Sequence, residues 1–110
     1  MQAKHIPNVP LRDLSIGAGH LPGLAKAVEE AGEFLQAAGK IIAYPNTPHP
    51  DGGGDINKRV QDEVADLLAA LLFFTEASPE RFDITGMHLR ASKKLRRFRE
   101  WHEQELRNAG

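Results

Sequence analysis

The chain has no cysteine and no long apolar run, and each absence excludes a class of protein. Without cysteine there is no disulfide framework, no thiolate zinc site and no cysteine nucleophile. The longest apolar stretch, residues 64–74, contains Asp66 and is shorter than the roughly 20 residues that a membrane helix needs. Residues 1–10 have no basic segment followed by an apolar run, so no secretory signal is readable. We expect a cytoplasmic protein without membrane contact.

The charge is distributed unevenly along a chain of otherwise ordinary composition. The 110 residues are 41% hydrophobic and 26% charged, which is typical of one globular domain spanning residues 1–110. The net charge of -1 hides an acidic part, residues 1–79, with six basic and ten acidic residues. Residues 80–110 hold eight basic and five acidic residues. This pattern favours cation binding in the acidic part and contact with phosphate or nucleic acid near the C-terminus.

The spacing of apolar residues predicts helices and no strands. Residues 1–21 lack periodicity and predict an irregular arm, whereas residues 22–42 carry apolar residues at helical spacing. Residues 44–55 hold three prolines and three glycines and predict a long loop. Residues 56–76 predict a second helix that is apolar on more than one face and therefore substantially buried.

A third helix is predicted near the sequence Ser78-Pro79-Glu80, which is a typical helix start, and it should reach about Leu106. Gly86 is a point where this helix could kink or split. The sequence thus predicts an all-α helical bundle of three to four main helices. Because the first two helices offer apolar area on several sides, we expect self-association to complete the bundle.

Two sets of carboxylates at helical spacing are the most informative feature. They are Glu29-Glu30-x-x-Glu33 on the first predicted helix and Glu63-x-x-Asp66 on the second. Residues three apart lie about 60° from each other on a helix surface, so each pair shares a face. By the same geometry Glu63 falls among the apolar residues of its helix, and Glu30 borders the apolar arc of the first. Glu29 points further away and faces water.

Carboxylates among apolar residues need a positive partner, because burying an unpaired charge costs on the order of several kcal/mol. The partner is either a basic side chain or a divalent cation. Two helices packed roughly 8–10 Å apart bring four carboxylates around one small volume. Oxygen donors alone suit Mg²⁺, and Mn²⁺ can substitute. A di-iron site needs Glu-x-x-His, which the sequence lacks because Glu33 and Asp66 stand at those positions.

The two acidic motifs resemble those of the MazG-like family of all-α nucleoside triphosphate pyrophosphohydrolases, and the likeness extends over about residues 24–101. It implies that Glu30, Glu33, Glu63 and Asp66 bind Mg²⁺. It also implies that a metal-activated water hydrolyses a nucleoside triphosphate, with ribose or deoxyribose, to the monophosphate and pyrophosphate. Glu29 or Glu33 would act as the catalytic base. Members of that family form dimers or tetramers, so a homodimer or homotetramer is expected.

The resemblance also implies that basic residues of the third helix bind the substrate phosphates. Lys93, Lys94 and Arg97 are the candidates, although Arg97 stands where the family pattern has asparagine after Lys93. Lys26 lies beside Glu30 on the helical wheel and is either a phosphate ligand or a neutralising neighbour. Lys58 and Arg59 are expected to form ordinary ion pairs one turn along their helix.

Two other functions fit parts of the pattern. The acidic helices are also similar to those of phosphoribosyl-ATP pyrophosphohydrolase, but Ala69 and Ala70 replace the tyrosine and histidine usual there. Alternatively, the basic third helix belongs to a non-catalytic module that binds nucleic acid or a protein partner. The net charge of -1 and the acidic part of the chain favour a small phosphate ligand over a nucleic acid. No motif indicates which base or sugar is preferred.

Overall fold

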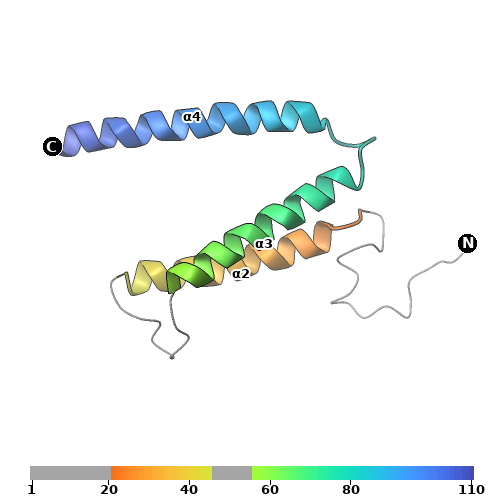
Figure 1. Cartoon of the computed structure of the whole chain (residues 1–110), viewed down its shortest axis with the longest axis horizontal. Helices are drawn as coiled ribbons and strands as arrows, with labels where there is room; N and C mark the ends of the chain where they lie inside the picture. The colour runs from red at the N-terminus through yellow and green to blue at the C-terminus, as the bar shows by residue number, and fades with distance from the viewer. Residues whose placement is uncertain (1–20, 46–55) are drawn as a thin grey trace, which may run out of the picture. The chain divides into compact units, whose positions relative to one another are not determined.

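The structure, a computed structural model, describes residues 21–45 and 56–110. In these ranges it contains three helices and no strand, which confirms the predicted all-α fold: α2 (Leu24–Ala43), α3 (Ile56–Glu76) and α4 (Ile84–Ala109) (Figure 1). The predicted arm, except Leu21, and residues 46–55 of the predicted loop lie outside the described residues. The chain divides into two units, residues 1–78 with α2 and α3, and residues 79–110 with α4.

A turn at Pro22 and Gly23 starts α2 two residues later than predicted. Gly23 has φ 86°, in the left-handed region that disfavours residues with a Cβ. A Cβ built at Gly23 would also lie only 2.7 Å from Cδ2 of Phe73 on α3. The carbonyl of Gly23 accepts the first helical hydrogen bond, from the backbone N–H of Ala27 at 2.9 Å. Both the backbone angle and the neighbouring ring therefore require glycine here.

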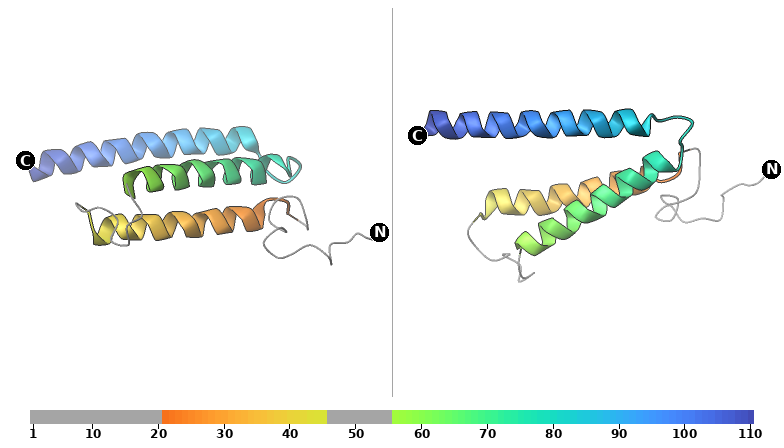
Figure 2. Two further views of the ribbon diagram at one scale, coloured as in Figure 1. Left: turned by 60° about the horizontal axis from the view of Figure 1, so that its bottom comes forward. Right: turned by 45° about the horizontal axis from the view of Figure 1, so that its top comes forward.

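Helices α2 and α3 pack side by side and run in opposite directions (Figures 1 and 2). The bounds of α3 are those predicted from the sequence. Small residues lie in the contact, since Ala27 and Ala37 of α2 and Ala70 of α3 are buried. Ile56 at the start of α3 is also buried. Alanines at these positions let the two helix backbones approach closely.

The prediction that the second helix is substantially buried is wrong. Val64, Leu68 and Leu71 of α3 are 47%, 56% and 45% exposed. Among the described residues, no large apolar side chain is fully buried. The physical reason is that α3 is apolar on more than one face, whereas α2 covers only one of them in this unit.

The third predicted helix starts later than the Ser78-Pro79-Glu80 signature indicates, so that part of the prediction is wrong. Residues 79–81 form a turn, and α4 begins at Ile84. The side chain of Asp83 caps the helix by accepting a 3.0 Å hydrogen bond from the backbone N–H of Gly86. The helix continues through Gly86 without a break and ends at Ala109, three residues beyond the predicted end.

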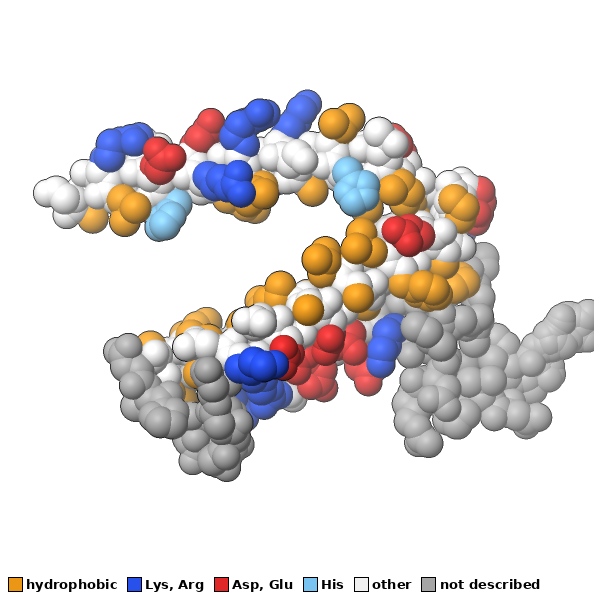
Figure 3. Space-filling view, in the orientation of Figure 1, with side chains coloured by type: hydrophobic (Ala, Val, Ile, Leu, Met, Phe, Trp, Pro, Cys, Tyr) orange, Lys and Arg blue, Asp and Glu red, His pale blue; other side chains and the backbone are white. Residues whose placement is uncertain are grey.

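Helix α4 has no buried residue, and its charged and apolar side chains separate along its length. In Figure 3, most Lys and Arg side chains of α4 gather along one side of the helix and hydrophobic side chains along another. None of the helices in the described ranges combines the length and the apolar character that crossing a membrane requires.

Candidate metal centre

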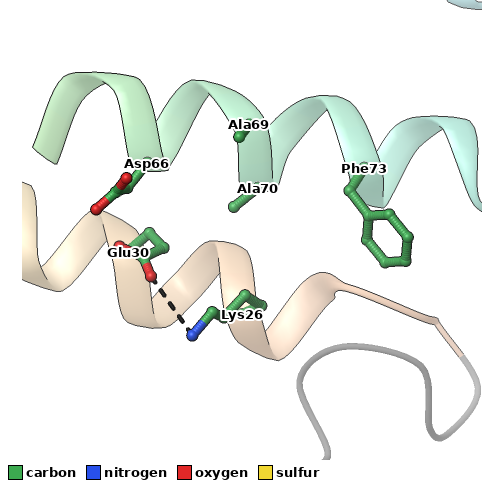
Figure 4. A pocket seen from close by; sticks show the side chains of 6 residues that line it. All are labelled: Lys26, Glu30, Asp66, Ala69, Ala70 and Phe73. Carbon is green, nitrogen blue, oxygen red and sulfur yellow. Dashed lines mark ion pairs between the residues drawn. The ribbon is translucent and has the colours of Figure 1, made fainter. Parts of the chain in front are cut away.

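Three carboxylates from two helices meet in the α2–α3 unit. Glu30 comes from α2, and Glu63 and Asp66 come from α3. One carboxylate oxygen of each lies within 4.8 Å of an oxygen of the other two. Figure 4 shows Glu30 and Asp66 pointing toward one another across the helix pair. Three of the four predicted metal ligands are therefore brought together.

The packing of the two helices explains why these carboxylates converge. Glu30 lies on the face of α2 that also holds buried Ala27 and half-buried Phe34. Glu63 lies on the face of α3 that holds buried Ala70. The side chains of Glu30 and Glu63 are each 15% exposed, whereas Asp66 is exposed at the edge of the contact. The apolar contact thus holds two of the carboxylates partly away from water.

The electrostatics of the cluster disfavour the ionised form of Glu63. Burial raises the pKa of Glu63 most, and the nearby charges of Glu33, Asp66 and Glu30 raise it further. Arg59 acts in the opposite direction, but its Nε lies 3.9 Å from Glu63 Oε2, beyond hydrogen-bond distance. The pKa of Glu63 therefore stays above its ordinary value, which indicates incomplete neutralisation of the cluster.

Lys26 lies at the edge of the cluster and contacts two acidic neighbours. Its Nζ donates a 3.1 Å hydrogen bond to Oε1 of Glu29 and lies 3.5 Å from Oε2 of Glu30 (Figure 4). The hydrogen bond to Glu29 is the main reason why the pKa of Lys26 is raised, so the amine stays protonated. Of the two roles predicted for Lys26, the structure displays that of a neutralising neighbour.

The two residues predicted as catalytic base occupy different surroundings. Glu29 is exposed and engaged with Lys26, outside the group of three carboxylates. Glu33 is also exposed and outside this group, but its charge raises the pKa of Glu63, so it lies close to the cluster. Glu33 is thus the better placed of the two to act near an ion held by the three carboxylates.

The ion pairs predicted one turn along α3 are confirmed. Nζ of Lys58 lies 2.8 Å from Oδ2 of Asp62, and Arg59 approaches Glu63 as described above. Both partners of the Lys58–Asp62 pair are exposed. Lys58 and Asp62 are therefore surface residues apart from the three carboxylates, and Asp62 offers a matched control for substitutions of Asp66.

The cations predicted to bind phosphate form a cluster of their own on α4. Lys93, Lys94 and Arg97, together with Arg90, line a shallow hollow on this helix, and all four are exposed. The guanidinium carbon of Arg97 lies 6.0 Å from the ring centroid of Trp101, a cation–π contact. Among the described residues, these lysines and arginines form no ion pair with a carboxylate. The cluster therefore offers uncompensated positive charge to an anion.

The donor set fits a small divalent cation. Oxygen ligands of one octahedral Mg²⁺ lie about 3 to 4 Å apart, since each Mg–O bond is about 2 Å long. The three carboxylate oxygens, within 4.8 Å of one another, reach this spacing after a side-chain adjustment of about 1 Å. Carboxylates that fill only part of the coordination sphere leave positions for water and phosphate oxygens.

No protein-family model, curated protein or solved structure matches this chain. The resemblance to the MazG-like family therefore stays a prediction carried by the acidic motifs of α2 and α3.

Proposed function

We propose that the protein is a Mg²⁺-dependent nucleoside triphosphate pyrophosphohydrolase that releases pyrophosphate and leaves the nucleoside monophosphate. The observation that carries this proposal is the convergence of Glu30, Glu63 and Asp66, with their oxygens within 4.8 Å of one another. The raised pKa of Glu63 supports it, because a bound cation would relieve the same repulsion. Mn²⁺ is expected to replace Mg²⁺.

Each residue of the site has its own role in the proposed hydrolysis. When bound, the ion neutralises charge on the phosphate oxygens and lowers the pKa of a bound water. Glu30, Glu63 and Asp66 hold it, and Glu33 completes the set or accepts the proton of the attacking water. The bond that breaks joins the α-phosphorus to the oxygen that leaves with pyrophosphate. Lys26 is near enough to Glu30 to reach a phosphate once the ion neutralises that carboxylate.

The positive cluster of α4 is proposed to contact phosphates as well, through Lys93, Lys94 and Arg97. Two observations on α4 support this role. The four cations that line the hollow are exposed, and they have no carboxylate partner among the described residues. A second candidate function, binding of a polyanion such as single-stranded nucleic acid, rests on the same cations and on the exposed ring of Trp101. A salt-dependent gel shift with single-stranded DNA, lost on Arg97→Ala plus Trp101→Ala, would support the second function.

The experiment for the proposed function is product analysis in ¹⁸O-labelled water. The chain is incubated with a panel of ribo- and deoxyribonucleoside triphosphates and Mg²⁺, and the products are resolved by phosphorus NMR. We expect monophosphate and pyrophosphate, with the label in the monophosphate because water attacks the α-phosphorus. Glu63→Gln should abolish turnover, whereas Asp62→Asn, an exposed acid one position away, should retain it. Release of inorganic phosphate and a diphosphate would contradict the proposal.

A further inference from the structure

A pocket of about 330 Å³ lies along the contact of α2 and α3, beside the three carboxylates. This volume falls within the range of small-molecule sites, about 300–1,000 Å³. In Figure 4, Glu30 and Asp66 lie at one end of the pocket and the ring of Phe73 lies at the other. The described residues that line it are Lys26, Glu30, Asp66, Ala69, Ala70 and Phe73. One end is therefore charged and the other is apolar.

The ring of Phe73 forms an aromatic surface, and the backbone at Gly23 holds one side of the ring in place. Part of the ring packs on Gly23, where a Cβ would lie 2.7 Å from Cδ2 and 3.1 Å from Cε2 of the ring. The residue is nevertheless 40% exposed. A ring held against backbone loses little freedom when a ligand packs on its exposed part. Phe73 thus offers a ready stacking surface.

Two alanines separate Phe73 from the carboxylates. Ala69 and Ala70 carry only methyl groups toward the pocket, which leaves space where a longer side chain would fill it. Phe73 stands seven positions after Asp66, which corresponds to about 10 Å along the helix at 1.5 Å per residue. This is the scale of a phosphate joined through a sugar to a heterocyclic base.

We infer that the pocket binds the base of a nucleotide, stacked on Phe73 above Ala69 and Ala70, with the phosphates directed toward the carboxylates and Lys26. The inference rests on the proposed function and adds the subsite that holds the substrate. A molecule that satisfies both ends needs a flat apolar ring and an anionic chain that binds through a cation. Since the described lining of the ring end offers no polar side chain, stacking supplies affinity there without reading the edge of the base.

The test compares two probes that share the anionic chain but differ in the ring. One is a nucleoside triphosphate with a non-hydrolysable methylene link between the α- and β-phosphorus atoms; the other is inorganic tripolyphosphate. Both are titrated calorimetrically with Mn²⁺ into the full chain and into two variants, Phe73→Leu and Ala69→Leu. Ala69 is exposed, so the leucine fills the pocket without entering the helix contact. The control is Ala65→Leu, an exposed alanine on α3 outside the pocket lining.

We expect both variants to weaken nucleotide binding about tenfold, the size of an aromatic–base stacking contribution, and to leave tripolyphosphate binding unchanged. Ala65→Leu should bind both probes like the wild type. Equal effects on the two probes, or no effect on either, would overturn the inference while leaving the proposed function intact. If Phe73→Leu is found to unfold, the Ala69→Leu result decides. Failure of the wild type to bind either probe with Mn²⁺ would overturn the inference together with the proposed function.

Discussion

Nζ of Lys26 lies 3.5 Å from Oε2 of Glu30, so an ammonium group stands beside one of the three converging carboxylates. The same nitrogen donates a hydrogen bond to Glu29, which keeps it on the α2 side of the cluster. A cation at this distance offsets part of the charge that a metal ion would otherwise neutralise. Under the proposed function, Lys26 and a divalent ion would compete for Glu30, and Lys26 would become available to phosphate when the ion binds.

Lys26→Met tests this competition. Removing the ammonium group should tighten binding of Mn²⁺ up to about fivefold at low salt, since a partly exposed ion pair contributes only a small energy. The same variant should weaken binding of tripolyphosphate in the presence of Mn²⁺. Calorimetric titration measures both. Lys58→Met removes an exposed lysine of α3 and should change neither. Weaker Mn²⁺ binding by Lys26→Met would show that the amine supports the site in another way.

The raised pKa of Glu63 predicts a dependence of stability on pH. Because the pKa is higher in the folded than in the unfolded chain, the unfolded state ionises first as the pH rises from the ordinary value of 4.5. The folded, metal-free protein therefore loses stability from about pH 4.5 up to the raised pKa, and the loss persists at neutral pH. Glu63→Gln should remove this loss and raise the melting temperature of the metal-free protein at pH 7.

Thermal unfolding between pH 4 and pH 8, with EDTA and with saturating Mn²⁺, measures the effect. With Mn²⁺ the wild type should gain stability as the pH rises, because protons and the ion compete for the same carboxylates. Glu63→Gln should lose the gain from Mn²⁺. A metal-free variant that is less stable than the wild type at pH 7 would contradict the account of Glu63.

A glycine just before α2 and a glycine within it predict opposite effects of alanine. Gly23→Ala should destabilise the fold by about 1–2 kcal/mol, because the residue has φ 86° and the new methyl would meet the ring of Phe73. Gly32→Ala should stabilise it by about 0.5–1 kcal/mol, since Gly32 lies inside α2 with open space where the Cβ would stand. Urea denaturation of both variants gives the two values. Equal effects would mean that the turn at Gly23 does not constrain the fold.

Exposed apolar residues on α2 predict self-association. Val28, Leu35 and Ile42 lie seven residues apart along one stripe of the helix and are 65%, 67% and 80% exposed. We propose that this stripe contacts a second copy of the chain. The wild type should sediment as a dimer or tetramer, and Leu35→Glu should weaken association at least about tenfold through the cost of burying a charge. Gln36→Glu adds the same charge to an exposed neighbour and should leave the mass unchanged. A monomeric wild type would refute the proposal.

The sequence predicted the helices better than their environment. The strong periodicity of residues 56–76 defined α3 to the residue, whereas α4 begins at Ile84 because Asp83, and not Ser78, caps the helix. The helical wheel found the apolar faces of α3 but not what covers them, so its burial was overestimated. A wheel describes one helix, and burial depends on its neighbours.

The carboxylate cluster was predictable because Glu30, Glu63 and Asp66 lie on the faces along which α2 and α3 pack. The pocket was not, because it depends on the register between the two helices, which sets Phe73 against Gly23. In the sequence, the adjacent alanines at positions 69 and 70 stand out only as a departure from the pattern of phosphoribosyl-ATP pyrophosphohydrolase. Their small size was the available signal for an open space beside the acids.

Mn²⁺ binding followed by electron paramagnetic resonance tests most directly whether the three carboxylates hold one divalent ion. We expect one Mn²⁺ bound per chain, displaced by Mg²⁺. Asp66→Asn should weaken binding by at least about tenfold, and Asp62→Asn should bind like the wild type. Equal Mn²⁺ affinity in the wild type and Asp66→Asn would show that the three carboxylates do not hold the ion.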